Sequence, residues 1–541
     1  YFRNYQVNNG ISSNTITSIA QDKKGFMWFG TRNGLNRFDG NTFSIFRNNI
    51  ADSLSLGSNS VLSLYEDDKE QLWVGTYKGI YLYDPLHESF RPFRKMAPGE
   101  IRYIKGDHLH NIWIVADFTL YKYNQPTGKL TVYPFKNAQA ICLAVTEDGA
   151  VWAAANNGVI KKYNAAADRF IDYDVSGNIN TVIQDLYPVN DSSIIIGTMN
   201  QALWYNLRTK SSYNIFKDYH DVQIHKILRQ SAHEYWFGTE NGLYIYEENT
   251  GKISLLQKQY NDPYAVSDNV IYSFYKDKEG GTWIGTFFGG INYYAAAYNR
   301  FRKYFPTSGS NSLSGNLVHE ICSDRYNNIW IGTEDAGLNK LNVSTGAIEH
   351  FMPGPGSISY SNIHGLIAAG NELWIGTYEH GLDVMDILTG KVIRHYDAHK
   401  DPSSFGSNFI VSLYKTRAGD ILVGTWGGLF RYNRRADNFV QLPFFKTQVQ
   451  AIHEDEHGTI WASTYGNGVY YFNQATGKGG ILKTGNGLIN NYVNNLYEDS
   501  RGQMWFCTEA GLCRYVPATG KFTSYTIENG LPDNQVFPVL E

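Results

Sequence analysis

The chain has 541 residues, and its 47 Lys and Arg stand against 51 Asp and Glu, so the net charge is only −4. This balance argues against a nucleic-acid binder, which needs a strongly basic surface. Aromatic residues make up 15% and charged residues 18%, which excludes a disordered chain. No apolar run approaches the roughly 18 residues that span a bilayer.

The first ten residues, YFRNYQVNNG, resemble residues 522–530, FTSYTIENG. Both segments are predicted to form the last strand of a four-stranded unit and the linker into the next unit. Because no strands precede the first segment, we expect it to complete a sheet formed later in the chain and so to close a ring. The chain starts at Tyr1 without a Met, and we expect it to be an excised or processed part of a longer protein.

A repeated motif begins at Asp22 and reads Asp-x-x-Gly-x-φ-Trp-φ-Gly-Thr, where φ is apolar. Its clearest copies are residues 22–31, 277–286 and 499–508, and two copies carry Ile195 and Leu422 in the Trp position. The twelve copies are spaced by about 43 residues, a period typical of propeller blades. The Trp anchors of the other ten copies are Trp28, Trp73, Trp113, Trp152, Trp236, Trp283, Trp330, Trp374, Trp461 and Trp505.

The second copy shows how one repeat divides into strands. Residues 60–65, 71–76, 80–83 and 90–93 are predicted strands, and polar turns separate them. Four antiparallel strands make one propeller blade, whose apolar faces are buried only when a neighbouring blade packs on them. The sequence therefore predicts an all-β fold of tandem β-propellers with four-stranded antiparallel blades.

The motif residues are predicted to have structural roles. We expect the Trp to lie between adjacent blades, the Gly to allow close approach of strands, and the Thr hydroxyl to bind backbone groups near the turn. The Asp six residues before the Trp is expected to cap its own turn. A catalytic or metal-binding role is disfavoured, because such a set would not be repeated from blade to blade. The Asp occurs in seven copies, as Asp22, Asp67, Asp107, Asp277, Asp324, Asp455 and Asp499.

Twelve blades are too many for one ring of about four to eight, which predicts two rings. We place the boundary after the seventh copy, so that residues 1–306 form a first propeller and residues 307–541 a second. Two seven-bladed rings are expected, with the second incomplete in this chain. Residues 534–541 look like the first strand of a thirteenth copy, so we expect the natural protein to continue.

Four cysteines are too few for a disulfide framework. Cys142 and Cys322 lie in apolar runs and are predicted to be buried thiols. Cys507 and Cys513 flank one tight turn and could face each other across a hairpin. A bridge between them would strain the strand pairing, and this alternative stays open.

The motif G-x-x-W-x-G-T-x-x-G-L-x-x-Y-D, clearest over residues 16–40, resembles the two-component regulator propeller repeat. The resemblance covers nearly the whole chain, although Val115-Ala116 and Ala154-Ala155 replace Gly-Thr in copies three and four. It implies two seven-bladed propellers that form the periplasmic sensor of a hybrid two-component system, common in Bacteroides and its relatives. Such a sensor detects an oligosaccharide or a monosaccharide and regulates glycan-utilisation genes. The resemblance also implies a homodimer.

In this family the full protein usually continues with a transmembrane helix, a histidine kinase, a receiver and a DNA-binding domain. This chain holds no kinase, receiver or helix-turn-helix motif. We therefore expect it to be neither an enzyme nor a nucleic-acid binder and to use no cofactor or metal. It would reach the membrane only through a transmembrane segment that follows it in the full protein.

A ligand site is expected on the turns between the second and third strands of the blades. These turns vary between copies while their flanks do not, and specificity usually lies in variable turns on a repeated frame. Aromatic residues beside polar ones suit the apolar faces and hydroxyls of sugars. Trp426 is the strongest candidate because it is a Trp outside the repeated position. The candidate residues are Trp426, Tyr378, His380, Tyr465, Arg32, Tyr77 and Lys78.

Other interpretations of these residues remain open. The aromatic candidates could instead plug the mouth of a ring or form a subunit contact. Arg32 and Lys78 lie in adjacent blades and could hold an anionic sugar, or they could be solvated surface charges. The whole chain could be a carbohydrate-active enzyme, or a scaffold that binds another protein.

The sequence gives little support to the enzyme interpretation. The Asp-box of sialidases has a spacing of five residues between Asp and Trp, where this repeat has six. His108 and His110 form an H-x-H pair without a marked third ligand, so a metal site is not supported.

Overall fold

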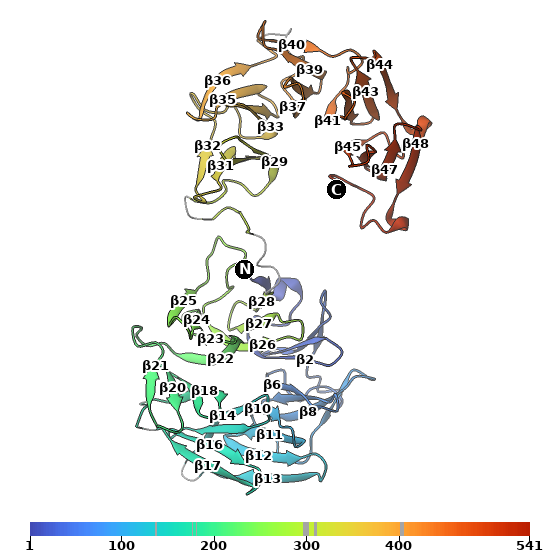
Figure 1. Cartoon of the computed structure of the whole chain (residues 1–541). Coiled ribbons are helices and arrows are strands. Elements are labelled where there is room, and N and C mark those ends of the chain that lie inside the picture. Colours follow the sequence, from blue (N-terminus) through green and yellow to red (C-terminus); the bar gives the residue numbers. More distant parts are fainter. Residues whose placement is uncertain are drawn as a thin grey trace. The chain divides into compact units, whose positions relative to one another are not determined.

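The computed structural model describes residues 1–135, 138–175, 177–179, 181–295, 302–307, 311–400 and 405–540. The chain divides into two compact units, Tyr1–Arg302 and Lys303–Glu541 (Figure 1). Twelve four-stranded antiparallel sheets form within the described residues, which confirms the predicted all-β fold with four-stranded blades. Part of the predicted boundary segment, residues 298–301, lies outside the described residues.

Seven sheets belong to the first unit, and we number them as blades 1 to 7. Their strands are β2 (Ile16–Gln21), β3 (Met27–Thr31), β4 (Gly34–Phe38) and β5 (Phe43–Phe46) in blade 1; β6 (Val61–Glu66), β7 (Leu72–Thr76), β8 (Gly79–Asp84) and β9 (Ser89–Pro92) in blade 2; β10 (Ile101–Gly106), β11 (Asn111–Ala116), β12 (Thr119–Asn124) and β13 (Lys129–Tyr133) in blade 3; β14 (Ala140–Val145), β15 (Val151–Ala155), β16 (Val159–Asn164) and β17 (Arg169–Asp174) in blade 4; β18 (Ile183–Asn190), β19 (Ser193–Thr198), β20 (Ala202–Asn206) and β21 (Ser212–Asn214) in blade 5; β22 (Ile224–Ser231), β23 (Glu234–Thr239), β24 (Leu243–Glu247) and β25 (Lys252–Leu256) in blade 6; and β26 (Ile271–Lys276), β27 (Thr282–Thr286), β28 (Ile291–Tyr294) and β1 (Arg3–Tyr5) in blade 7.

Five sheets belong to the second unit, and we number them as blades 8 to 12. Their strands are β29 (Val318–Ser323), β30 (Asn328–Thr333), β31 (Leu338–Asn342) and β32 (Ile348–Phe351) in blade 8; β33 (Ile363–Ala369), β34 (Glu372–Thr377), β35 (Leu382–Asp386) and β36 (Lys391–Tyr396) in blade 9; β37 (Ile410–Lys415), β38 (Ile421–Thr425), β39 (Gly428–Asn433) and β40 (Asn438–Gln441) in blade 10; β41 (Val449–Glu454), β42 (Thr459–Thr464), β43 (Val469–Asn473) and β44 (Lys478–Leu482) in blade 11; and β45 (Val493–Glu498), β46 (Met504–Thr508), β47 (Gly511–Val516) and β48 (Lys521–Tyr525) in blade 12.

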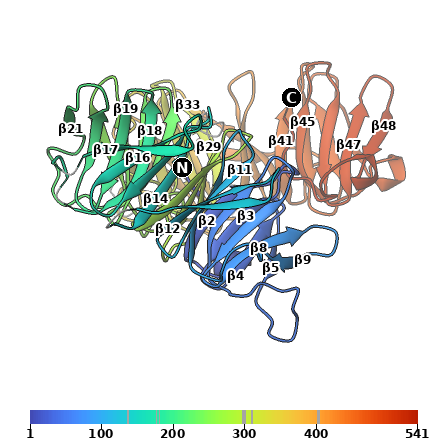
Figure 2. The ribbon, with the colours of Figure 1, turned by 90° about the horizontal axis from the view of Figure 1, so that it is seen from below.

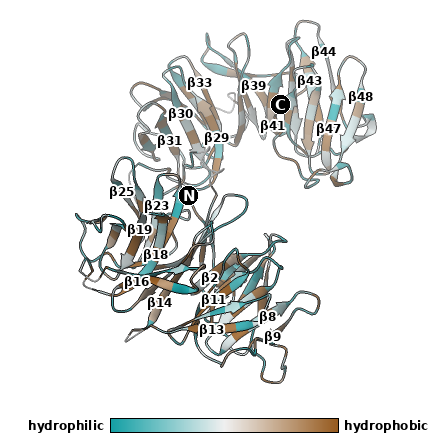
Figure 3. Cartoon of the chain, turned by 60° about the horizontal axis from the view of Figure 1, so that its bottom comes forward, coloured by the Kyte–Doolittle hydropathy of each residue, from teal (hydrophilic) through white to brown (hydrophobic). Residues whose placement is uncertain are grey.

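In every blade except blade 7 the strands follow chain order from the innermost strand A to the outermost strand D, as β2 to β5 show in Figure 2. In blade 7 the outermost strand is β1, from the start of the chain. Hydrophobic stretches lie along the strands of both units (Figure 3). Three short 3-10 helices occur in the described residues, η1 (Val7–Asn9), η3 (Thr484–Asn486) and η4 (Ile527–Asn529). Both η1 and η4 follow a strand D, so the similarity between the start of the chain and residues 522–530 reflects the same local structure.

The first strand of the chain closes the first unit. Strand β1 pairs antiparallel with β28, with Arg3 opposite Tyr293 and Tyr5 opposite Ile291. Strand A of each blade contacts strand A of the next, and β26 of blade 7 contacts β2 of blade 1. The prediction that the first segment completes a later sheet and closes a ring is therefore confirmed. The blade number predicted for a complete second ring stays a prediction.

The start of a thirteenth copy is not a strand in this structure. Residues 534–540, predicted as a further strand A, have no strand assignment. The Val536 N–H donates to the Thr508 carbonyl at 3.0 Å, which places the segment beside blade 12. A strand forms only where a neighbouring strand pairs with it, and none of the described strands pairs with residues 534–540.

The repeated Asp has a second role that the sequence did not reveal. Asp22 Oδ1 accepts from the Phe26 N–H at 2.9 Å, which is the predicted turn cap. Its Oδ2 accepts from the indole N–H of Trp28 at 2.8 Å. The same carboxylate–indole bond forms in all seven copies with the Asp, at 2.7–2.9 Å. The spacing of six residues between Asp and Trp therefore lets one carboxylate both cap the turn and hold the indole of the anchor Trp in place.

The anchor Trp packs against the next blade, as predicted. Trp28 of blade 1 meets Tyr83 of blade 2 with ring centroids 4.8 Å apart, and Trp374 of blade 9 meets Tyr432 of blade 10 at the same distance. The motif Thr also behaves as predicted. The Thr31 hydroxyl donates to the Gly34 carbonyl at 2.8 Å, across the turn between strands B and C.

The motif Gly makes room for the next blade. A methyl group on Gly75 of blade 2 would lie 2.7 Å from Cγ2 of Ile101, the first residue of strand A in blade 3. Blade 3 departs from the motif with Val115 in the Gly position. There the first residue of the next strand A is Ala140, and both are buried in one cluster. A larger residue on one blade is thus matched by a smaller one on its neighbour.

The four cysteines are free thiols. Cys142 is buried as predicted, whereas Cys322 is only partly buried because strand β29 is largely exposed. Cys507 pairs with Leu512, and Cys513 pairs with Phe506. Successive register positions on a strand point to opposite faces, so the two thiols do not face each other and the alternative of a hairpin bridge is wrong.

Candidate functional site

One face of each unit carries the turns between strands B and C. The first residue of this turn donates its N–H to the carbonyl of the residue that precedes strand A in the same blade. Tyr77 donates to Ser60 at 3.1 Å, Tyr378 to Asn362 at 3.1 Å and Trp426 to Phe409 at 3.3 Å. The B–C turn and the linker into strand A therefore lie side by side on this face.

Five aromatic rings from three adjacent blades form a continuous series on this face of the second unit. We call it the aromatic rim, and it consists of His319, His364, Tyr378, Phe409 and Trp426. The ring centroids are 3.9 Å apart for His319 and His364, 4.9 Å for His364 and Tyr378, 5.1 Å for Tyr378 and Phe409, and 4.1 Å for Phe409 and Trp426. Blades 8, 9 and 10 contribute to it in order.

Trp426 is the exposed end of the aromatic rim. Its indole stacks on Phe409 with an angle of 9° between the rings, and Tyr378 meets it edge-on at 6.2 Å. The Trp426 side chain is nevertheless 44% exposed. Because Phe409 covers only one face of the indole, an apolar surface remains open to a ligand.

The imidazoles of the aromatic rim are uncharged at neutral pH. Burial, together with the neighbouring charge of His319, lowers the pKa of His364 to about 4. Burial also lowers the pKa of His319, while the carboxylate of Glu334 opposes this shift. Burial raises the pKa of the Glu320 carboxyl, next to His319, to about 7. Neutral imidazoles both donate and accept hydrogen bonds, as binding of sugar hydroxyls requires.

Two further predicted residues of the second unit form separate pairs. His380 stacks on Tyr360 at 4.2 Å with an angle of 19°. Tyr465 meets Tyr492 edge-on at 4.8 Å, and the two residues also form an isolated antiparallel bridge. The structure thus joins Tyr378 and Trp426 in one series, whereas the contacts of His380 and Tyr465 are with other rings.

The predicted residues of the first unit lie apart from one another. The guanidinium of Arg32 lies over the ring of Phe287 in blade 7, at 4.7 Å. Lys78 lies in blade 2, on the other side of blade 1, where its N–H donates to the Thr76 hydroxyl at 3.1 Å. Tyr77 is 59% exposed. Arg32 therefore belongs to a contact with blade 7, and no contact within the described residues joins Arg32 to Lys78.

Sequence reasoning missed three of the five rings in the aromatic rim. His319 and His364 are each the second residue of a strand A, and Phe409 directly precedes one. In a single copy, an aromatic residue at the start of strand A is expected to be part of the hydrophobic core. Aligning the copies shows a signal, because the same strand position holds His225, Tyr272, His319 and His364 in four consecutive blades.

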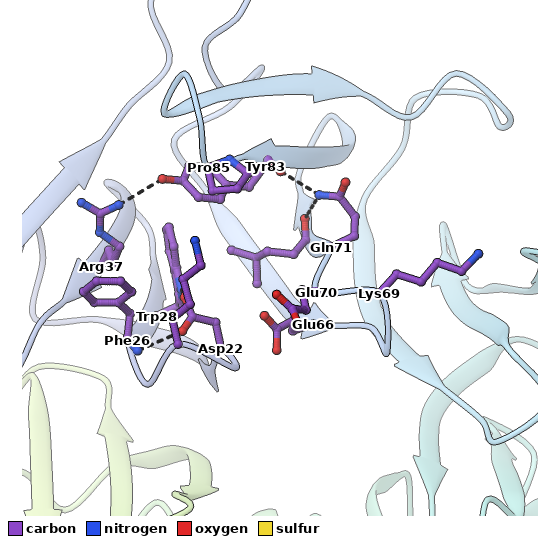
Figure 4. Close-up of a pocket in the computed structure, with 12 residues that line it drawn as sticks. Asp22, Phe26, Trp28, Arg37, Glu66, Lys69, Glu70, Gln71, Tyr83 and Pro85 are labelled. Carbon is purple, nitrogen blue, oxygen red and sulfur yellow. Dashed lines mark hydrogen bonds between the residues drawn. The ribbon is translucent and has the colours of Figure 1, made fainter.

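A cavity of about 480 Å³ lies elsewhere, between blades 1 and 2 (Figure 4). In it the guanidinium of Arg37 lies 5.8 Å from the ring of Trp28 and donates to the Tyr83 hydroxyl at 3.1 Å. A cation lies over the anchor Trp in the same way in five other blades, as Lys122 over Trp113, Lys162 over Trp152, Lys340 over Trp330, Arg394 over Trp374 and Arg514 over Trp505. Because the arrangement is repeated, we assign it to blade packing.

No group of three or more His, Cys, Asp or Glu side chains in the described residues is placed to hold a metal ion. In the same residues no helix has the length and apolar character needed to cross a membrane.

Five of the repeats match a known repeat family. The family model for the two component regulator propeller matches residues 10–33, 55–78, 265–288, 312–335 and 487–510. These five segments are regulator propeller repeats. A protein named histidine kinase P4, from Formosa agariphila, is 49% identical over 55 residues, which are 10% of this chain and 4% of that protein. The chain therefore matches a small part of that relative's length.

Solved structures resemble the chain over nearly all of its length. The extracellular domain assigned to a hybrid two component system of B. thetaiotaomicron has a TM-score of 0.67 and 22% identity, over 99% of this chain and 80% of that one. A second extracellular domain from that organism, assigned to a one component system, has a TM-score of 0.48 and 20% identity, over 97% and 73% of the two chains. The first of these shows that the two chains share a fold.

Proposed function

We propose that the chain is the ligand-binding sensor region of a hybrid two-component receptor and that its ligand is an oligosaccharide or a monosaccharide. The observation that carries the proposal is Trp426, an exposed indole backed by Phe409 within a series of five rings. A flat apolar surface of this kind suits the C–H face of a pyranose ring, and the neutral imidazoles beside it suit the hydroxyls.

The regulator propeller repeats support the signalling part of this proposal. In it, the sensor region lies in the periplasm, forms a homodimer and regulates glycan-utilisation genes through a kinase elsewhere in the full protein. Ligand would shift the dimer between two arrangements, which requires different affinities for the two states. The chain itself would not be an enzyme.

The test is a thermal-shift screen of the whole chain against purified glycans and their mono- to hexasaccharides. A ligand at a hundredfold excess over its dissociation constant stabilises the folded state by about 2.7 kcal/mol. We expect one saturable shift, with the glycan recovered intact, and we expect Trp426→Ala to weaken binding roughly tenfold or more.

The matched control is Tyr326→Ala. Tyr326 is an exposed aromatic residue of the same unit, and it lies in the turn between strands A and B, on the opposite face. Binding should be unchanged in this variant. Recovery of cleaved glycan would show that the chain is an enzyme and not a sensor. Equal loss of binding in Trp426→Ala and Tyr326→Ala would show that the aromatic rim is not the ligand site.

A further inference from the structure

Side chains from four blades meet in the middle of the first unit. The strands A of this unit surround its centre, among them β10, β14, β18 and β22 (Figure 1). Lys226 of blade 6 forms an ion pair with Asp185 of blade 5 at 2.6 Å. Its ammonium also lies 5.7 Å from the ring of Tyr103, which belongs to blade 3. A contact between blades 3 and 6, which are not neighbours, places this group at the ring centre.

Asp185 is fully engaged in this cluster. Its side chain is 2% exposed, and its Oδ2 accepts from the Ile227 N–H at 2.8 Å. Its Oδ1 accepts from Lys226 at 2.6 Å and from the thiol of Cys142 in blade 4 at 3.9 Å. The charge of Asp185 is thus balanced by Lys226.

Lys105 adds a second positive charge without a partner. It lies two residues beyond Tyr103 on strand β10, so both side chains leave the strand on the same side. Among the described residues no acceptor lies within hydrogen-bond distance of its ammonium. The Lys105 side chain is exposed to water. Desolvation by neighbouring protein groups, together with the charge of Lys226, lowers the pKa of Lys105 to about 8.

The cluster therefore holds two cations against one anion, and its donors exceed its acceptors. The phenol of Tyr103 is also kept in its neutral, donating form, because burial raises the pKa of Tyr103. The two ammonium groups repel each other, and an anion bound beside them would offset this repulsion.

We propose that the centre of the first unit is a binding site for a monovalent carboxylate, held by the ammonium of Lys105 and the hydroxyl of Tyr103. Lys226 contributes by its charge, while its own hydrogen bond is given to Asp185. The site is separate from the aromatic rim and does not depend on the ligand proposed there.

The test uses acetate as the carboxylate and the whole chain as the protein. Acylation of each lysine by an amine-reactive reagent at pH 8 is measured by peptide mass spectrometry, with sodium acetate against sodium chloride at equal ionic strength. Acetate bound at Lys105 stabilises the unreactive ammonium form, so we expect the acylation of Lys105 to fall. Lys129, an exposed residue of blade 3, is the internal reference and should be unaffected.

Crystals soaked in bromide, a monovalent anion with an anomalous signal, locate the site directly. We expect a peak beside Lys105 and Tyr103 that acetate displaces, that is lost in Lys105→Met and that persists in Lys129→Met. In Tyr103→Phe, acetate should bind about tenfold more weakly, as expected for loss of one hydrogen bond to a charged group. Bromide found only on the outer surface, or unchanged acylation of Lys105 in acetate, would overturn the proposal.

Discussion

Tyr5, in the first strand of the chain, stacks on Trp283 of blade 7 with ring centroids 5.9 Å apart and an angle of 26° between the rings. Tyr5 is buried, and its ring also meets Phe38 of blade 1 at 5.2 Å. This residue therefore links the two blades whose contact closes the first unit.

Replacement of Tyr5 by Ala should destabilise the first unit. Truncation of a buried aromatic residue costs about 3–5 kcal/mol, because it removes apolar contacts and leaves a cavity. Urea denaturation followed by tryptophan fluorescence measures the change. Tyr5→Phe keeps the ring and should remain within about 1 kcal/mol of the parent chain. Equal stability of all three proteins would show that β1 contributes little to closure.

The carboxylate–indole bond can be tested at Asp67. Its Oδ2 accepts from the indole N–H of Trp73 at 2.8 Å, and its Oδ1 accepts from the Gln71 N–H at 2.9 Å. Asp67→Ala leaves both donors without this partner, and hydrogen bonds to a charged group are worth about 1.5–3 kcal/mol each. Asp67→Asn retains an acceptor oxygen and should lose less. Denaturation midpoints of the two variants measure the difference, and an equal loss would contradict the assigned geometry.

The close packing of Gly75 against Ile101 predicts a double-mutant result. Gly75→Val should destabilise the first unit by about 1–3 kcal/mol, because the added side chain overlaps Ile101. Combining it with Ile101→Ala reproduces the natural pair of Val115 and Ala140. The double variant should therefore be more stable than the sum of the single changes predicts. Simple additivity would show that the two positions do not share one space.

The second unit should respond to pH through two opposing groups. His364 has its pKa lowered from 6.5 to about 4, so its contribution to stability is full above pH 6.5 and declines as the pH falls toward 4. Glu320 has its pKa raised from 4.5 to about 7, so its contribution is full below pH 4.5 and is lost as the pH rises through 7. The two trends partly cancel in the parent chain.

Single variants separate these trends. In His364→Phe, stability should fall more steeply between pH 4.5 and 7, because only the Glu320 trend and the smaller effect of His319 remain. In Glu320→Gln, stability should rise over the same range. Melting temperatures across pH 4 to 8 measure both slopes. Identical pH profiles for the three proteins would contradict the burial of these groups.

Most of the fold could be predicted from the sequence, because each blade repeats one strong signal. The Trp position, the turn residues and the spacing defined four strands in every copy, and the orphan strand at the start indicated closure. The bond between Asp22 and Trp28 was not predicted, because strand alternation does not show that a turn carboxylate reaches the indole. The suggestion that Cys507 and Cys513 face each other across the hairpin was wrong, because Cys507 pairs with Leu512 and the neighbouring residue Cys513 points to the opposite face of the sheet.

The candidate site could be predicted only in part. Trp426 and Tyr378 stood out because they occupy variable turns. His364 lies in strand A, and Phe409 lies in the linker before it. An aromatic residue at these positions is expected to be a core residue, and only the contacts between neighbouring blades show its place in the aromatic rim. The charged cluster of Lys105, Asp185 and Lys226 could not be predicted at all, because the blades that supply it are far apart in the sequence.

The pairing of Arg3 with Tyr293 also governs how the chain is made. During synthesis β1 leaves the ribosome before its partner β28, which follows only after nearly the whole first unit has been translated. At translation rates of about 5–20 residues per second, β1 waits roughly 15–60 s with unpaired backbone groups. A strand exposed for so long is a site of mispairing with other chains. The nascent first unit is therefore expected to need a chaperone until its last blade emerges.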